Sequence, residues 1–417
     1  MVDSSDVFTA DAKLTPYWWE EAPRPDRREV ALPQIADVVV IGSGYAGLSA
    51  ALTLARAGRN VVVVDAGDPG FGASSRSGGM IGSGHRLSYF DLVDRYGEKS
   101  AVDLLNEGLR SLKFTIDLIE RENIDCPYQR SGRFLGAAKP RDYERIGREV
   151  DALKRVTDAE IDMVPASEQR NEIVTERYAG GCVYHQHGGL HPGLLHHGLM
   201  ARAETAGATV VGHAKVRAID GQQGSFTIVT KKGSIAAADV VVATNGYTDV
   251  ALTPRLARSL IPVAAFVVAT EPLGQNAVKS LIPGGRMIVE THRRHCYYRA
   301  SPDGDRILFG ARAALHAIDP VKSGKRLQRF IGDVFPDLQQ VRLSHSWSGF
   351  IAFSRDTLTH IGEQNGIHFA LACNGSGVTM APYAGHKAAL KLLGSREGRT
   401  AFDDHEFRPY PLYAGRP

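Results

Sequence analysis

The sequence predicts an α/β fold in which a parallel-sheet domain, assembled from separate chain segments, joins a second α+β domain of antiparallel sheet and helices. The pattern of residues 37–67 predicts a strand, a glycine turn, a helix and a second strand. Residues 366–394 again predict a strand, a glycine turn and a helix. Long excursions of different composition lie between them, and 417 residues suffice for two hydrophobic cores. We therefore expect the first domain at 1–95, 180–247 and 342–417, and the second at 96–179 and 248–341.

Each element of the first unit has its own signal. Residues 38–41 are a continuous β-branched run, which is typical of a strand buried on both faces of a parallel sheet. Apolar residues at helical spacing follow over 48–55, with Gly58 as a helix end, and a second β-branched run occupies 61–64. This order predicts a βαβ unit.

The segments between these two units contain sequence patterns typical of helices and of strands. Apolar and charged residues at helical spacing predict helices at 89–123, 141–156 and 194–206. Short strands with turns are expected at 208–220, 224–246, 261–272, 295–301 and 306–312.

Charge, hydropathy and cysteine content exclude several classes of protein. The formal net charge of +3 is too small for a nucleic-acid-binding surface. No apolar run is long enough for a membrane span or resembles a secretory signal, so a cytoplasmic protein is expected. The cysteines form no CxxC pair and are expected to be reduced, structural thiols. No metal is expected, because no carboxylate or cysteine completes a site with His185, His187 and His191.

Gly42, Gly44 and Gly47 form a GxGxxG fingerprint that predicts dinucleotide binding. The first two glycines permit a tight turn and close approach to a pyrophosphate, and the third lets helix and strand pack. The N-terminus of the following helix supplies free N–H donors for the phosphates. Asp65, at the end of the second strand, is placed to accept hydrogen bonds from the adenosine ribose, and its charge disfavours NADP.

Further glycine-rich stretches favour FAD over NAD. The loop GFGASSRSGGMIG at 70–82 can bring backbone N–H groups close to phosphates and an isoalloxazine edge. The chain returns at 244–246 and again at 371–382, where a second helix N-terminus favours negative charge on a reduced flavin. An NAD-dependent dehydrogenase and a non-catalytic nucleotide-binding protein are the alternatives. The residues expected to hold the cofactor are Gly42, Ser43, Gly44, Tyr45, Ala46, Gly47, Asp65, Ala66, Gly72, Ala73, Ser74, Arg76, Ser77, Gly78, Gly79, Met80, Thr244, Asn245, Gly246, Asn374, Gly375, Ser376, Gly377, Val378 and Thr379.

Successive blocks of the chain resemble the FAD-dependent D-amino acid oxidase superfamily: GSGYAG, GFGASSRSGGM, GGLHPG, YYRASPDGDRILFG, RDTLTHIG and CNGSGVTMAP. The opening YWWEEAPRP is similar to that of the γ-glutamylputrescine oxidase-like branch, and the resemblance covers nearly the whole chain. It implies a Rossmann-like FAD-binding domain, built from discontinuous segments, that supports an antiparallel sheet over the flavin. It also implies that the backbone of Val216 contacts the adenine.

Three departures from the family pattern shape the expected chemistry. The stretch HSWSGFIAF lacks the cysteine to which sarcosine oxidases attach the flavin, so FAD is expected to be non-covalent. Residues 346–353 and 374–378 lack the arginines with which glycine and D-amino acid oxidases hold a substrate carboxylate, which disfavours a simple α-amino acid. Leu308 and Phe309 stand where sarcosine oxidases keep an oxygen-activating lysine, so O2 and another electron acceptor both stay open.

The resemblance implies oxidation of the C–N bond of a small-molecule amine or amino-acid derivative, by hydride transfer to flavin N5 followed by imine hydrolysis. A glycine or D-amino acid type oxidase or dehydrogenase is the alternative. In HCYYRAS, strand alternation sends Tyr297 and Arg299 to one face and Tyr298 to the other, and which face lines the pocket stays open. Tyr298, Arg299 and Trp347 are the expected substrate residues, and 292–295 is expected to be a solvated turn. The sequence indicates neither the compound nor the oligomeric state.

Overall fold

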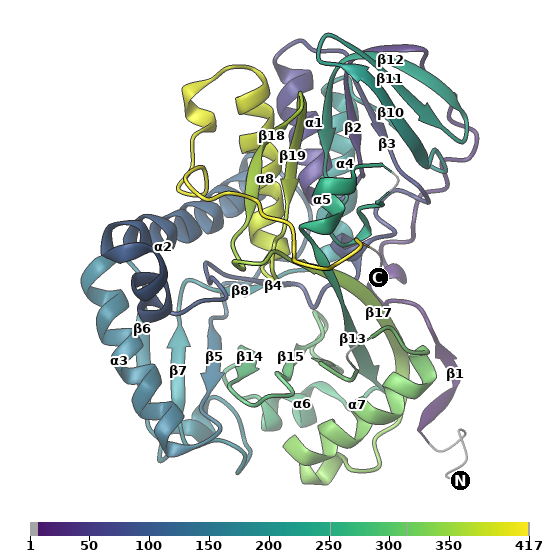
Figure 1. The fold of residues 1–417 in the computed structure, drawn as a ribbon. Helices are drawn as coiled ribbons and strands as arrows, with labels where there is room; N and C mark the ends of the chain where they lie inside the picture. Colours follow the sequence, from purple (N-terminus) through teal and green to yellow (C-terminus); the bar gives the residue numbers. More distant parts are fainter. Residues whose placement is uncertain (1–6, 251, 315, 416–417) are drawn as a thin grey trace.

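The computed structural model describes residues 7–250, 252–314 and 316–415. Residues 1–6, 251, 315 and 416–417 also fall within the predicted domain ranges and lie outside this description. The described chain forms two large sheets with helices, which confirms the predicted α/β class. In Figure 1 the first sheet occupies the upper half of the molecule and the second sheet the lower half.

The first sheet contains the predicted βαβ unit. Its strand order is β10-β11-β12-β2-β3-β9, and β19 pairs with both β12 and β18. Strands β19, β12, β2, β3 and β9 run parallel to their neighbours in this central part. The strands are β2 Ile35–Ile41, β3 Val61–Val64, β9 Thr209–Val211, β10 Val216–Gln222, β11 Ser225–Thr230, β12 Gly233–Val242, β18 His360–Gln364 and β19 Ile367–Leu371.

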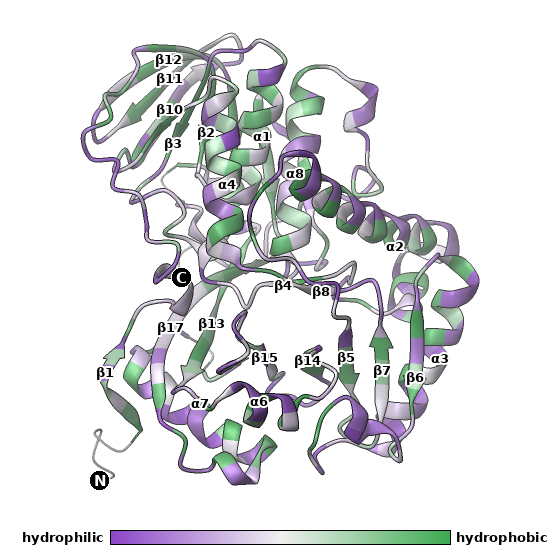
Figure 2. Ribbon diagram, turned by 180° about the vertical axis from the view of Figure 1, so that it is seen from behind, coloured by the Kyte–Doolittle hydropathy of each residue, from purple (hydrophilic) through white to green (hydrophobic). Residues whose placement is uncertain are grey.

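Helices α1 Tyr45–Arg56, α4 Pro192–Thr205 and α8 Gly377–Leu392 pack on one face of this sheet. In β2 the side chains of Val38 and Val40 join the core beneath these helices, whereas Val39 and Ile41 join the core on the opposite face. In Figure 2, helices α1 and α8 accordingly contain many hydrophobic residues, drawn in green. The continuous β-branched run therefore follows from burial on both faces.

The second sheet has the order β1-β17-β13-β16-β15-β14-β5-β7-β6. Its strands are β1 Phe8–Lys13, β5 Arg133–Gly136, β6 Ile161–Val164, β7 Gly181–Tyr184, β13 Ile261–Thr270, β14 Met287–Glu290, β15 Tyr297–Ala300, β16 Ile307–Ala311 and β17 Leu343–Phe353. Short strands β4 Met80–Ile81 and β8 Gly188–Gly189 pair between the two sheets. The remaining helices are α2 Tyr89–Arg121, α3 Pro140–Val156, α5 Pro254–Arg258, α6 Gln275–Leu281 and α7 Pro320–Val334. None of the helices described has the length and apolar character needed to cross a membrane.

Sheet membership differs from the expected division at three strands. Strands β1, β7 and β17 fall within the ranges assigned to the first domain, yet they pair in the second sheet. The reason is non-local: β17 pairs antiparallel with β13 along its whole length, from Leu343 to Phe353. The domain bounds themselves stay a prediction.

Helix α7 follows the last strand that the sequence predicts in this excursion, 306–312, in a stretch to which the sequence patterns assigned no element. Asp319 caps it through hydrogen bonds from the backbone amides of Val321 and Lys322, and Pro320 occupies its first turn. Its buried residues Leu327 and Ile331 recur at helical spacing, so this periodicity was a detectable signal.

Candidate cofactor and substrate site

A cavity of about 820 Å³ lies where the carboxyl ends of β2 and β3 meet the second sheet. Its wall combines the β2–α1 turn, the loop 65–82, Val216, the turn before α8 and the face of the second sheet around Tyr297. The volume falls in the range of ligand pockets in proteins. Because ligands of doubly wound folds bind outside the carboxyl ends of the strands, this cavity is the candidate site.

The β2–α1 turn leaves open space for a ligand because two of its residues, Gly42 and Gly44, lack side chains. Gly42 has a φ of 102°, and a Cβ there would lie 2.9 Å from the carbonyl oxygen of Ala243. A Cβ on Gly44 would lie 3.0 Å from Oγ of Ser74. Gly47 lies behind the wall, where a Cβ would lie 1.8 Å from the carbonyl oxygen of Gly42. The third glycine therefore allows α1 to pack against the turn.

The Asp65 carboxylate, at the end of β3, is a fixed and half-buried acceptor. Its Oδ2 accepts from the backbone N–H of Ser43 at 2.9 Å and from Ser43 Oγ at 2.6 Å, and Oδ1 accepts from the backbone N–H of Gly67 at 3.1 Å. Burial raises the pKa of Asp65, and these hydrogen bonds oppose the rise. The carboxylate thus has a set orientation in the cavity wall, suited to hydroxyl donors of a ribose.

Two tryptophans near the N-terminus hold the loop that lines the cavity. They lie in a 3-10 helix, Tyr17–Trp19. Trp18 Nε1 donates to the carbonyl oxygen of Ser77, and Trp19 Nε1 donates to Oγ of Ser75, both at 2.8 Å. In the sequence these tryptophans contribute only to the resemblance to a family. Their role was not predicted, because a contact between segments so far apart in the chain leaves no local pattern.

The turn before α8 presents backbone to the cavity. Asn374 and Gly375 have φ values of 49° and 99°, and residues 373–379 line the wall. Oγ1 of Thr379 accepts from the backbone N–H of Gly82 at 3.0 Å, which joins this turn to the glycine-rich loop. The N-terminal end of α8 favours negative charge in the adjacent space.

Most residues expected to hold the cofactor line the cavity: Gly42, Gly44, Tyr45, Ala46, Asp65, Ala66, Gly72, Ala73, Ser74, Arg76, Ser77, Gly78, Met80, Val216, Thr244, Asn245, Asn374, Gly375, Ser376, Gly377, Val378 and Thr379. The others, Ser43, Gly47, Gly79 and Gly246, lie outside the lining. Ser43 holds Asp65, and a Cβ on Gly246 would lie 3.0 Å from Cβ of Phe350. Contact of all these residues with FAD stays a prediction.

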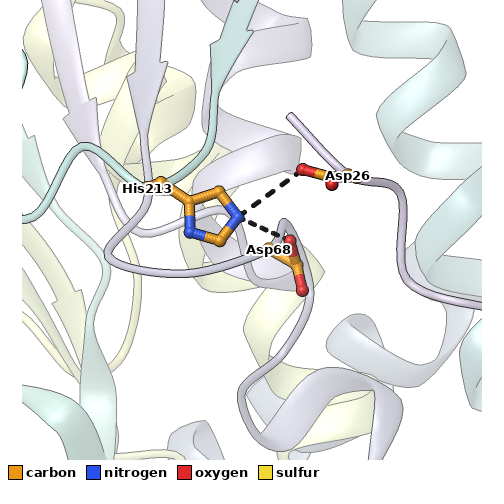
Figure 3. Close-up of side chains that lie close together, drawn as sticks. All are labelled: Asp26, Asp68 and His213. Carbon is orange, nitrogen blue, oxygen red and sulfur yellow. Dashed lines mark hydrogen bonds and ion pairs between the residues drawn. The ribbon is translucent and has the colours of Figure 1, made fainter. Parts of the chain in front are cut away.

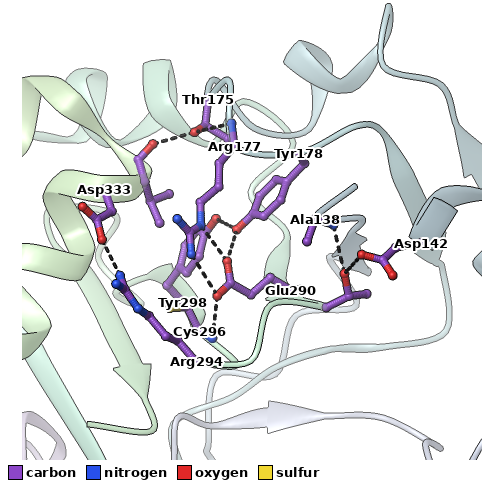
Figure 4. A network of polar contacts seen from close by, with 12 residues as sticks. Ala138, Asp142, Thr175, Arg177, Tyr178, Glu290, Arg294, Cys296, Tyr298 and Asp333 are labelled. Atoms are coloured by element: carbon purple, nitrogen blue, oxygen red, sulfur yellow. Dashed lines mark hydrogen bonds and ion pairs between the residues drawn. The ribbon is translucent and has the colours of Figure 1, made fainter. Parts of the chain in front are cut away.

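Tyr298 belongs to the core on the opposite face of the second sheet, so the expected substrate contact is corrected. Its hydroxyl shares a hydrogen bond of 2.7 Å with the Tyr178 hydroxyl, and its ring stacks on Phe309. Tyr178 also donates to Glu290, which forms a salt bridge of 2.9 Å with Arg177 (Figure 4). Strand alternation turns Tyr298 into this buried network and away from the cavity.

Replacing Glu290 with glutamine is expected to lower the free energy of unfolding by about 2 kcal/mol, because the half-buried Arg177 loses its counter-charge. Burial acts to raise the pKa of Glu290, but hydrogen bonds from Arg177 and Cys296 outweigh it and hold the pKa below 4.5. This stabilisation is therefore present above pH 4.5 and is lost as the pH falls through the lower, folded-state pKa. Urea unfolding of both proteins should show their difference shrinking in acid, and a constant difference would contradict the role.

Arg299 and Trp347 lie behind the cavity wall, and their expected substrate contacts are also corrected. Nη1 of Arg299 donates to the carbonyl oxygens of Leu190 at 2.9 Å and Gly79 at 3.1 Å. Trp347 Nε1 donates to the carbonyl oxygen of Arg76 at 2.8 Å. Both side chains are buried and use these donors on backbone, so they position the glycine-rich loop.

Tyr297 is the residue of this strand that faces the cavity. Strand pairing places Leu135, Val289, Tyr297 and Gly310 in one row across β5, β14, β15 and β16. A Cβ on Gly310 would lie 2.2 Å from Cζ of Tyr297, so glycine makes room for the ring. Burial raises the pKa of Tyr297, which keeps its hydroxyl protonated at neutral pH.

Cationic side chains that the sequence did not reveal also line the cavity: Arg86, Arg133 and Arg312. His295 lines it as well, which corrects its expected place in a solvated turn. Nη1 of Arg86 lies 3.5 Å from Nε2 of His295. Burial and the charges of Arg86 and Arg312 lower the pKa of His295 to about 4, so it is neutral at pH 7. These residues meet only through the pairing of distant strands.

Asp26, Asp68 and His213 come together at the surface outside this cavity (Figure 3). Nε2 of His213 lies 2.7 Å from Oδ1 of Asp68 and 3.8 Å from Oδ1 of Asp26. Nε2 of His213 is hydrogen-bonded to Asp68, and we interpret the group as a structural contact that ties the N-terminal segment to the loop after β3.

Comparisons with known proteins all find flavin-dependent oxidoreductases or proteins of similar sequence and fold. The family described as DAO, FAD dependent oxidoreductase, matches residues 37–390. The chain is 30% identical over 385 residues to the probable oxidoreductase OrdL of Haemophilus influenzae, covering 91% of this chain and 88% of the relative. It is also 30% identical over 377 residues to the gamma-glutamylputrescine oxidoreductase of Escherichia coli, covering 90% and 88%. The solved glycine oxidase of Geobacillus kaustophilus has the same fold, with a TM-score of 0.76 at 22% identity over 91% of this chain and 100% of that one.

Proposed function

Because this chain belongs to the family of FAD-dependent oxidoreductases, as its sequence blocks predict, we propose that it oxidises a C–N bond of an amine or amino-acid derivative. The observation that carries the proposal is one continuous cavity that extends from the GxGxxG turn to Tyr297 and the cationic side chains of the second sheet. The similarity to gamma-glutamylputrescine oxidoreductase supports an amine-bearing substrate.

The residues present suit FAD. The open turn at Gly42 and Gly44 would hold the pyrophosphate, Asp65 the ribose, Val216 the adenine edge and the turn before α8 the anionic side of the ring. Bound FAD supplies a two-electron acceptor at N5 for the hydride from the carbon next to nitrogen, after which water hydrolyses the released imine.

The chain's own residues would orient the substrate and control its protonation. Leu135, Val267 and Val289 give the pocket apolar walls, which exclude water around the reacting carbon. The amine must be neutral, because its lone pair stabilises the positive charge that develops as hydride leaves. The positive charges of Arg86, Arg133 and Arg312 in the cavity wall would lower the pKa of the ammonium form of a bound substrate by charge repulsion. The substrate amine would then lose its proton to solvent.

The purified protein is expected to be yellow and to release FAD when it is precipitated with acid. Cys373 lies in the cavity wall, but burial raises its pKa to about 12, so it stays a thiol and lacks the reactivity of a thiolate. Absorbance spectra of supernatant and pellet measure the release. Colour retained in the pellet would contradict non-covalent binding, and a colourless protein that FAD cannot reconstitute would contradict the cofactor.

The reaction class is tested by an anaerobic screen in which amines are mixed with the holoenzyme and loss of flavin absorbance is followed. N-substituted and ω-amino compounds are expected to reduce the flavin faster than glycine or D-alanine. Fastest reduction by D-alanine would favour the α-amino acid oxidase alternative, and no reduction by any amine would contradict the proposal. Reoxidation on admitting air then distinguishes an oxidase from a dehydrogenase.

A further inference from the structure

We propose that Arg133 binds a carboxylate group of the substrate, at the end of the molecule away from the oxidised C–N bond. The inference rests on the proposed function and narrows its substrate class to amines that carry a second, anionic end.

The surroundings of Arg133 lack a counter-charge. Its side chain lies in the cavity wall at the start of β5, with the guanidinium carbon 4.8 Å from the centre of the Tyr184 ring. Nε is buried and has no hydrogen-bond partner among the described residues. Burial lowers the pKa of Arg133, and no carboxylate of the described chain counteracts the effect. A bound carboxylate would complete this environment, since its two oxygens match a guanidinium.

Two other arginines near this part of the second sheet form salt bridges, whereas Arg133 forms none with the described residues. Arg177 pairs with Glu290 at 2.9 Å, and Arg286, next to the β14 partner of Arg133, pairs with Glu172. A buried guanidinium without a partner is costly, and the structural arginines of this sheet have one: a carboxylate for Arg177 and Arg286, and backbone carbonyls for Arg299. Nε of Arg133 has no such partner among the described residues, and Arg133 lies in the cavity wall.

The position of Arg133 suits an elongated ligand. In the second sheet β14 lies between β5 and β15, and Arg133 pairs with Met287 whereas Tyr297 pairs with Val289. The backbone of Arg133 therefore lies about 10 Å across the sheet and about 7 Å along it from the backbone of Tyr297. A carboxylate attached directly to the reacting carbon does not span this distance. A carboxylate several bonds from the amine does.

The cavity rim adds positive charge. Arg86 and Arg312 lie in the wall, and partial desolvation together with the charge of Arg312 lowers the pKa of Arg86. His295, which precedes β15, has a backbone φ of 51°, a value that is uncommon for residues other than glycine. These groups would draw an anionic substrate toward Arg133.

The test measures binding, separately from turnover. Oxidised holoenzyme is titrated with hexanoate and with hexanamide, and flavin absorbance or calorimetry gives each Kd. Wild type is expected to bind hexanoate at least about tenfold more tightly than hexanamide, and Arg133→Met to lose this preference while its hexanamide affinity stays the same. Arg294→Met is the matched control, because Arg294 is exposed, pairs with Asp333 and lies outside the cavity wall.

Each outcome decides the proposal. Equal affinity of wild type for the two probes would overturn the subsite without any variant, and so would a preference that survives Arg133→Met. Arg133→Lys keeps the charge without the planar fork, so an intermediate Kd supports the assignment if Arg133→Met does not fold. A flavin that no amine reduces, in an enzyme that still prefers hexanoate through Arg133, would refute the oxidation and leave the anion subsite standing.

Discussion

Replacing Gly44 with valine is expected to abolish retention of FAD. Gly44 has an extended backbone, with φ of −74°, so a side chain there causes no conformational strain. The effect is steric: a Cβ would lie 3.0 Å from Oγ of Ser74, which accepts from the backbone N–H of Tyr45 at 3.0 Å. The two γ-methyl groups of valine would then extend into the space where we place the pyrophosphate. The ratio of flavin to protein absorbance after purification measures the loss.

Two further variants give this experiment its meaning. Gly147→Val adds the same atoms in helix α3, where the nearest neighbour, Cε of Met163, lies 3.7 Å away, and it should leave the flavin content unchanged. Asp65→Ala removes acceptors without blocking space, so it should weaken binding less than Gly44→Val does. A folded Gly44→Val protein with wild-type flavin content would show that the pyrophosphate lies elsewhere.

The nucleotide half of the fold was predictable because its signals are local. The run of residues 38–41 reports burial on both faces of one strand, and GxGxxG reports a turn in which side chains would collide. The glycine turn before α8 is local too, and its residues line the cavity as expected. A short window of sequence contains the physical cause in each of these places.

The substrate half was less predictable because its causes are non-local. Strand alternation correctly separates Tyr298 from Tyr297 and Arg299, since Tyr298 lies in the opposite core. Alternation does not reveal that the Arg299 guanidinium reaches two carbonyls of distant segments, nor that β5 brings Arg133 beside β14. Strand pairing between remote segments decides which polar residues meet in the cavity.

Replacing Arg299 with alanine is expected to lower the free energy of unfolding by about 2–3 kcal/mol and to release FAD. The guanidinium is buried, and its loss removes the donor of the Leu190 carbonyl and one of the two donors of the Gly79 carbonyl, which keeps the backbone N–H of Leu190 at 2.8 Å. Burial lowers the pKa of Arg299 to about 10, so it still carries its charge and strong donors at pH 7. Urea unfolding of the apoprotein gives the stability, and flavin absorbance gives the retained cofactor.

The same variant separates the structural role from the one that the sequence suggests. A substrate contact at Arg299 would raise the KM of a carboxylate-bearing amine while stability and flavin content stayed unchanged. The geometry gives the opposite pattern, because Gly79 directly precedes Met80 in the cavity wall and loses one of its two carbonyl donors with Arg299. Arg299→Lys keeps one donor within reach and should recover part of the stability. A KM effect alone, with wild-type unfolding, would return Arg299 to the substrate pocket and leave the loop to be held by Trp18 and Trp347.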